Sequence, residues 1–215
     1  MRDKRRVWRS WIVRIYKDAS YLVVSKRTYE RTGEIVRGNP AIQSPGHFHD
    51  WLSRNYGLAS ASGVRRLTDI RSDSVSLKRL LKEMSSNTQV LSRKSFVALY
   101  QSSMRQLGER DFDRITGGKG NAYYPKALID DDLRQLDRAV KRIRRFVDTR
   151  LAHLDQKNKF RKLPTFDDVF AAVDLIYVLS KKYYFVLKAI EMPDPRLRGD
   201  WTDIFEKPWI VPVAV

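Results

Sequence analysis

The segment from residue 127 to residue 156 constrains the fold more than any other part of the sequence. Apolar side chains recur in it at intervals of three and four residues, at Ile129, Leu133, Leu136, Val140, Ile143, Val147, Leu151 and Leu154. An α-helix turns once every ~3.6 residues, so this spacing places all of these side chains along one side of a helix. A helix with one apolar side buries that side against other elements. We therefore expect a long helix over residues 127–156.

Residues 8–30 show the same helical spacing. Their apolar positions are Trp8, Trp11, Ile12, Ile15, Tyr16, Ala19 and Leu22. A β-hairpin is the alternative for the later part, because residues 21–24 and 34–36 flank a Thr-Gly pair. We prefer the helix, which Gly38, Asn39 and Pro40 would end.

Further helices and one loop are expected along the rest of the chain. They are a helix over residues 47–69, a helix capped by Asp73 or Ser74 with Leu77, Leu80, Leu81 and Met84 on its core side, a helix over residues 92–107, a loop over residues 108–126, and a helix over residues 166–191 capped by Thr165. No internal repeat or interdomain linker is visible in the sequence. The sequence therefore predicts an all-α bundle of about five to six helices, formed by residues 1–215 as a single domain.

The charge balance of the chain points to a polyanionic partner. Lys and Arg number 42 and Asp and Glu number 25, which gives a formal net charge of +17. Such a surplus attracts anions and carries no information about the fold. RNA is our first expectation, with DNA, an acidic protein and an anionic membrane surface as alternatives.

Some classes of protein are excluded by what the sequence lacks. It contains no Cys, which excludes disulfides, thiolate zinc sites and cysteine nucleophiles. No run approaches the ~18 apolar residues of a membrane span. The first residues, MRDKRRVWRSW, lack the apolar stretch of a secretory signal. We expect a cytoplasmic protein.

The expected long helix is also strongly basic. Its cations are Arg138, Lys141, Arg142, Arg144, Arg145 and Arg150. The helix dipole favours cations in the last turn only, so it does not account for those inside the helix. At 100° per residue, His153, Arg150, Phe146 and Arg142 share a flank outside the apolar seam, and Asp148 falls on the far side.

This flank combines groups that suit work on a phosphodiester. An imidazole exchanges a proton near neutral pH, and an arginine can hold a phosphate with two hydrogen bonds. The alternative is that His153 is an ordinary surface or capping histidine.

The residues around His153 also resemble a known family. Residues 146–155, FVDTRLAHLD, resemble the signature helix of the HEPN superfamily, in particular its abortive-infection (Abi-type) branch. Residues 64–69 and 73–81 resemble the Arg-Arg-x-x-Asp and Ser-Leu-x-x-Leu-Leu segment of the same branch. Asn39-Pro40 and residues 205–209 add weaker matches, so the resemblance spans most of the chain.

The resemblance implies a HEPN-like helical bundle that forms a homodimer and brings two signature helices together. In active members Arg and His form a metal-independent endoribonuclease site that needs no cofactor, and the RNA 2′-OH attacks the adjacent phosphate. On this basis His153 is the expected general acid or base, Arg150 contacts phosphate, and Asp148 orients or neutralises these groups. Arg142, Arg145, Phe146, Arg65 and Arg66 are the expected RNA-binding residues. The protein would act as a toxin or in phage defence.

The spacing of the signature differs from the usual pattern, and two functions therefore stay open. In most members the arginine lies further from the histidine than Arg150 does, and nearer than Arg145. Either Arg150 substitutes in an active nuclease, or the protein is a non-catalytic module that binds RNA or an acidic partner such as an antitoxin.

Two other groups of residues have ready structural explanations. Asp69 can form an ion pair with Arg66 at i,i+3 or with Arg65 at i,i+4, and such a pair would brace a helix or meet the signature helix. His47 and His49 with Asp50 would diverge on a helix, so we expect no metal site there.

Overall fold

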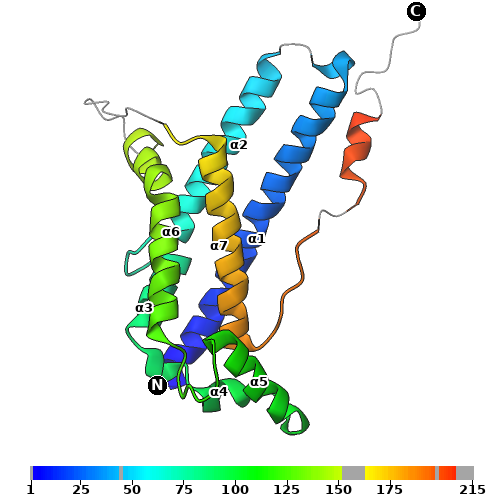
Figure 1. The fold of residues 1–215 in the computed structure, drawn as a ribbon. Helices are drawn as coiled ribbons and strands as arrows, with labels where there is room; N and C mark the ends of the chain where they lie inside the picture. The colour runs from blue at the N-terminus through cyan, green and yellow to red at the C-terminus, as the bar shows by residue number, and fades with distance from the viewer. Residues whose placement is uncertain (1, 44–45, 152–162, 197–198, 207–215) are drawn as a thin grey trace, which may run out of the picture.

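The all-α architecture predicted from the sequence is confirmed. The computed structural model describes residues 2–43, 46–151, 163–196 and 199–206, and these contain seven α-helices and no strand. The helices lie side by side as an elongated bundle, with a small pair of helices at the end where the chain begins (Figure 1).

The N-terminal segment forms one helix and no hairpin. Helix α1 (Arg2–Gly38) buries Trp8, Ile12, Ile15 and Ala19, as the spacing predicted. It ends before Asn39, and the single turn η1 (Pro40–Ile42) follows. Helix α2 (His47–Leu67) then runs back along α1, and their contact is close: a Cβ at Gly63 would lie 2.6 Å from the Leu22 side chain.

Helices α6 (Lys126–Phe146) and α7 (Phe166–Lys188) complete the main layer of the bundle. Helix α7 packs against α1, α6 and α2, and in Figure 1 it lies between α1 and α6. Its predicted cap is confirmed. The Thr165 hydroxyl accepts from the Asp168 amide, and the Asp168 carboxylate accepts from the Thr165 amide.

The third helix begins later than predicted. Helix α3 (Leu77–Ser85) is capped by Ser76, and neither Asp73 nor Ser74 serves as the cap. The Ser76 hydroxyl accepts from the Arg79 amide at 3.1 Å and donates to the Asp69 carbonyl. This second bond ties Ser76 to the residues just after α2, so a contact between segments favours Ser76 as the cap over the predicted Asp73 and Ser74.

The predictions of a helix over residues 92–107 and a loop over residues 108–126 are wrong in part: the α-helix is interrupted at residues 98–104, and the loop is confined to residues 117–125. The structure has two short helices instead, α4 (Arg93–Val97) and α5 (Arg105–Thr116), joined by a turn. Arg93 forms salt bridges with Glu109 at 2.8 Å and Asp113 at 2.5 Å. Few residues of α5 face inward, so its sequence shows little apolar periodicity. The salt bridges from Arg93 connect α5 to α4 and stabilise it as a helix.

The predicted long basic helix is confirmed in part. Helix α6 follows the predicted spacing through Phe146, but the next turn, η4 (Val147–Leu151), is π-helical. A π-turn contains one more residue than an α-turn, so it changes which side of the helix later residues face. Residues 152–156, the remainder of the predicted helix, lie outside the described residues.

A buried carboxylate connects α6 to α7. Asp132 is 6% exposed and accepts from the Lys182 ammonium at 2.6 Å and from the Tyr183 hydroxyl at 2.7 Å. Tyr183 is fully buried, and burial, together with the nearby Tyr124 and Asp132, raises its pKa. The hydroxyl therefore stays protonated and keeps donating to Asp132.

Replacing Asp132 should destabilise the bundle, whereas its neighbour should matter far less. We expect Asp132→Ala to cost about 3 kcal/mol, because it leaves a buried hydroxyl and an ammonium group without their acceptor. Asp131→Ala is the matched control, since Asp131 makes only exposed contacts with Arg134 and Gln135. Urea unfolding of both variants measures the difference, and equal losses would contradict this role of Asp132.

Candidate nucleic-acid interface

Asp69 organises the junction between α2 and α3. Its carboxylate accepts from the Ile70 amide at 2.8 Å and from the Arg71 side chain at 2.9 Å, and it forms a salt bridge with Arg65 at 3.3 Å. Burial opposes the charged form, but these hydrogen bonds outweigh it and lower the pKa of Asp69 to about 2. Asp69 is therefore ionised at neutral pH and holds Arg65 in place.

Arg65 joins the two stretches of sequence that carried the HEPN resemblance. Its Nε donates to Asp148 Oδ1 at 2.6 Å, while its Nη1 contacts Asp69. The hydrogen bond to Asp148 raises the pKa of the Arg65 guanidinium. Because Asp148 lies in the π-helical turn, this bridge fixes η4 against α2.

The structure places the two predicted RNA-binding arginines of α2, Arg65 and Arg66, in different contacts. The Arg65–Asp69 pair predicted at i,i+4 is confirmed, and the same arginine reaches the signature segment. Arg66 lies apart from this bridge and forms an exposed salt bridge with Asp18 of α1 at 3.1 Å. Arg65 is thus held by two carboxylates, of which Asp148 is exposed, and Arg66 braces α2 against α1.

A basic depression lies on the side of α6 that leads into η4. It has a volume of about 530 Å³ and is lined by Lys141, Arg144, Arg145, Asp148, Asp137 and Val140, among others. Both carboxylates already have partners, since Asp148 binds Arg65 and Asp137 binds Lys78. The cations therefore dominate the electrostatic potential of this surface.

Two of these cations make no salt bridge within the described part of the chain. Arg144 has a buried Nε without a hydrogen-bond partner. Lys141 is exposed, and no carboxylate among the described residues lies within salt-bridge distance of it. Arg145 is exposed and lines the same depression.

The basic surface continues along the outside of α6. Arg134, Arg138, Lys141 and Arg145 are all exposed and are spaced by four, three and four residues. This spacing places them in one row over ~16 Å of helix. Arg134 pairs with Asp131 at 3.0 Å, and Arg138 makes no salt bridge with a described residue. We call this row together with Arg144 the basic face of α6.

Arg142 and Phe146 lie on a different side of α6 from Arg145 and Asp148. Arg142 forms an exposed salt bridge at 3.2 Å with Asp168, whose carboxylate completes the capping box that Thr165 begins at the start of α7. Phe146 is half-buried and lines an apolar cavity of about 510 Å³ with Phe166 and Leu163. The structure therefore divides the predicted RNA-binding residues of this helix between two surfaces.

The prediction that placed His153 beside Phe146 and Arg142 assumed an unbroken α-helix. That assumption is wrong, because the π-turn η4 lies between them. His153 itself lies outside the described residues. The backbone of Arg150 belongs to η4, and its side chain is not among those described.

Sequence reasoning gave too little weight to Arg138, Lys141 and Arg144. Arg138 and Lys141 form a row with Arg134 and Arg145 at helical spacing, a signal that is present in the sequence, whereas the position of Arg144 beside this row depends on the fold. The pairing of Asp137 with Lys78 could not be read from sequence, because it joins α6 to α3.

A helix suited to crossing a membrane is not found among the described residues: none is both long enough and apolar enough.

The fold and this surface define a class of protein. A helical bundle whose long basic helix is joined through Arg65 to the preceding helices agrees with the HEPN-like bundle expected from the resemblance. Residues 5–183 match the HEPN_AbiU2 family model, described as AbiU2, and the chain therefore belongs to this family of HEPN-like abortive-infection proteins. No curated protein and no solved structure matches the chain.

Asp69 should make stability depend on pH in the acid range. Its pKa in the folded protein, about 2, lies below the ordinary value of 3.8, so its contribution is complete above pH ~4 and is lost as the pH falls towards 2. We expect Asp69→Asn to be less stable than the wild type at pH 7, and the difference to shrink between pH 4 and 2. Urea midpoints at several pH values test this, with the neighbouring Asp73→Asn as control. A difference that stays constant over this range would contradict the assignment.

Proposed function

We propose that this AbiU2-family protein targets RNA, and that the basic face of α6 is the surface that contacts the RNA backbone. The observation that carries this proposal is the depression beside η4, where both carboxylates are paired within the protein while Lys141 and Arg144 have no carboxylate partner among the described residues. Phosphates of a polyanion would supply the missing partners. The net charge of +17 favours the same class of ligand.

RNA cleavage at the adjacent signature segment is the more specific part of the proposal. His153 would act as general acid or base and Arg150 would contact the scissile phosphate, as the family resemblance implies. Asp148 would act indirectly, since it binds Arg65 and so fixes the π-turn from which the signature continues. A homodimer would bring two such segments together, and an acidic antitoxin would compete with RNA for the basic face.

A non-catalytic RNA-binding role is the second candidate function. The observation that favours it is the spacing in the sequence. Arg150 lies closer to His153 than the arginine of most members does, and Arg145 lies further away, so no arginine stands at the usual distance. Binding through the basic face does not depend on His153, so the two roles can be separated by experiment.

Removing the cations of the basic face should weaken RNA binding in a salt-dependent way. We expect the triple variant Arg138→Gln, Lys141→Gln and Arg144→Gln to lower the slope of log K against log salt by about two, because each phosphate contact on a single strand contributes roughly 0.7. Filter binding of a labelled single-stranded RNA at several salt concentrations measures this slope.

The control for this measurement has the same charge change elsewhere. Arg105, Arg110 and Lys119 are exposed on or beside α5, and their triple replacement by Gln should leave the slope nearly unchanged. Equal effects of the two triple variants would mean that net charge alone attracts RNA, and would contradict the proposed surface.

Cleavage is tested separately from binding. We expect the purified protein to cleave tRNA or total RNA in the presence of EDTA, and His153→Ala to abolish cleavage while retaining RNA binding, because the imidazole moves protons. If His153→Ala cleaves as the wild type does, the activity belongs to another site. Salt-dependent binding without cleavage in the wild type would establish the non-catalytic role instead.

A further inference from the structure

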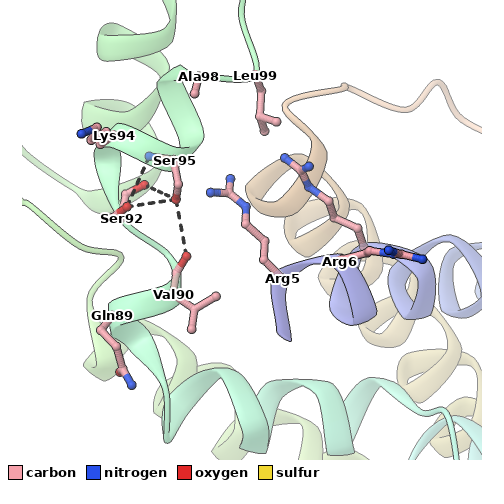
Figure 2. Close-up of a pocket in the computed structure, with 10 residues that line it drawn as sticks. Arg5, Arg6, Gln89, Val90, Ser92, Lys94, Ser95, Ala98 and Leu99 are labelled. Carbon is pink, nitrogen blue, oxygen red and sulfur yellow. Dashed lines mark hydrogen bonds between the residues drawn. The ribbon is translucent and has the colours of Figure 1, made fainter. Parts of the chain in front are cut away.

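A second basic cavity lies where the first turns of α1 face α4. Its volume is about 710 Å³. Its walls come from Arg5, Arg6 and Arg9 of α1 and from residues of the turn η2 (Thr88–Val90) and of α4, including Ser92, Ser95 and Lys94. Figure 2 shows the α1 side chains on one side of this space and the serines on the other.

The charge of this cavity is not balanced from within. Among the residues that the structure describes, its lining includes Arg5, Arg6, Arg9 and Lys94 and no carboxylate. Among the side chains that the structure describes, no Asp or Glu forms a salt bridge with any of these four cations. Arg9 donates from Nε to the Leu187 carbonyl at 2.9 Å, which orients it at the end of α7.

Arg5 is the cation most in need of a partner. Its Nε is buried and has no hydrogen-bond partner. Its side chain extends from α1 towards Ser92 and Ser95 (Figure 2). Burial, followed by the charge of Arg9, lowers the pKa of the Arg5 guanidinium to about 10, so it remains charged at neutral pH at a cost in free energy. A bound anion would offset that cost.

The other lining groups limit what a ligand can bind besides the cations. The Ser92 hydroxyl accepts from the Ser95 amide at 3.3 Å, and the Ser95 hydroxyl donates to the Ser92 carbonyl at 2.9 Å, so both already take part in hydrogen bonds (Figure 2). No aromatic side chain of a described residue lines the cavity, so within this part of the chain a base finds no ring to stack on. The volume lies within the ~300–1,000 Å³ range of small-molecule sites.

This cavity is separate from the basic face of α6 near η4. In Figure 1 the start of α1 and α4 lie at one end of the bundle, and the last turns of α6 lie at the other. A ligand here would therefore bind without occupying the proposed RNA surface near η4.

We propose that the cavity between α1 and α4 binds a phosphorylated small molecule through its phosphate groups, with Arg5 as the main contact. The guanidinium of Arg5 donates to the phosphate oxygens, and Lys94 and Arg6 add charge at the rim. The part of the ligand beyond the phosphates contributes little, because the cavity offers it few polar or aromatic partners.

Isothermal titration calorimetry of the full chain at low salt tests this proposal with three probes: pyrophosphate, ADP and adenosine. We expect pyrophosphate and ADP to bind with similar affinity and adenosine not to bind. ADP binding much tighter than pyrophosphate would show that the nucleoside is recognised as well, and would contradict recognition through the phosphates alone. Adenosine binding as well as ADP does, or no binding of either phosphate probe, would overturn the proposal.

Variants then locate the binding. Arg5→Gln should weaken pyrophosphate binding at least about tenfold, the effect of losing a hydrogen bond to a charged group. Lys94→Gln, on the exposed surface of α4, should also weaken pyrophosphate binding. This variant tests the proposal if Arg5→Gln fails to fold. Arg14→Gln is the matched control, an exposed arginine further along α1, and should bind as the wild type does. Equal losses in all three variants would place the anion elsewhere.

Discussion

Helix α7 buries a broad side against three other helices, and this packing fixes most of the molecule. Val173, Ile176 and Tyr183 are almost fully inaccessible, because α1, α2 and α6 all pack against α7. The bond from Tyr183 to Asp132 then sets the rotation of α6 about its axis. With the apolar side of α6 held inward, its cations face outward. The basic face of α6 is thus a consequence of the same packing that stabilises the bundle.

A second constraint acts where α6 ends. Arg65 binds Asp69 at the end of α2 and Asp148 in the π-turn, so the turn is held by the segment that the family resemblance also singled out. Two motifs whose linked residues are 83 positions apart in the sequence are therefore held together by this bridge. The residues beyond the turn start from a position that α2 and α3 define.

The sequence predicted elements well wherever apolar spacing was regular over several turns. Residues such as Ile12 and Ile143 lie in the core as expected, and the cap at Thr165 was found from its position before an apolar run. Prediction failed for α5, because its inward side has few apolar residues and its helix is stabilised by Arg93. It also failed at the start of α3, where three polar residues were equally good caps.

For the candidate site, the sequence by itself determined the family, the all-α class and the basic character of the long helix, because these depend on residue types and local spacing. Only the tertiary structure decided which cations have carboxylate partners, because Asp137 and Asp148 bind residues of other helices. It also decided the π-turn after Phe146, which ends the regular 100° spacing on which the prediction for His153 depended. Local periodicity contains no information about such distant contacts. These contacts leave Lys141 and Arg144 as cations without a carboxylate partner among the described residues, beside carboxylates that are already paired.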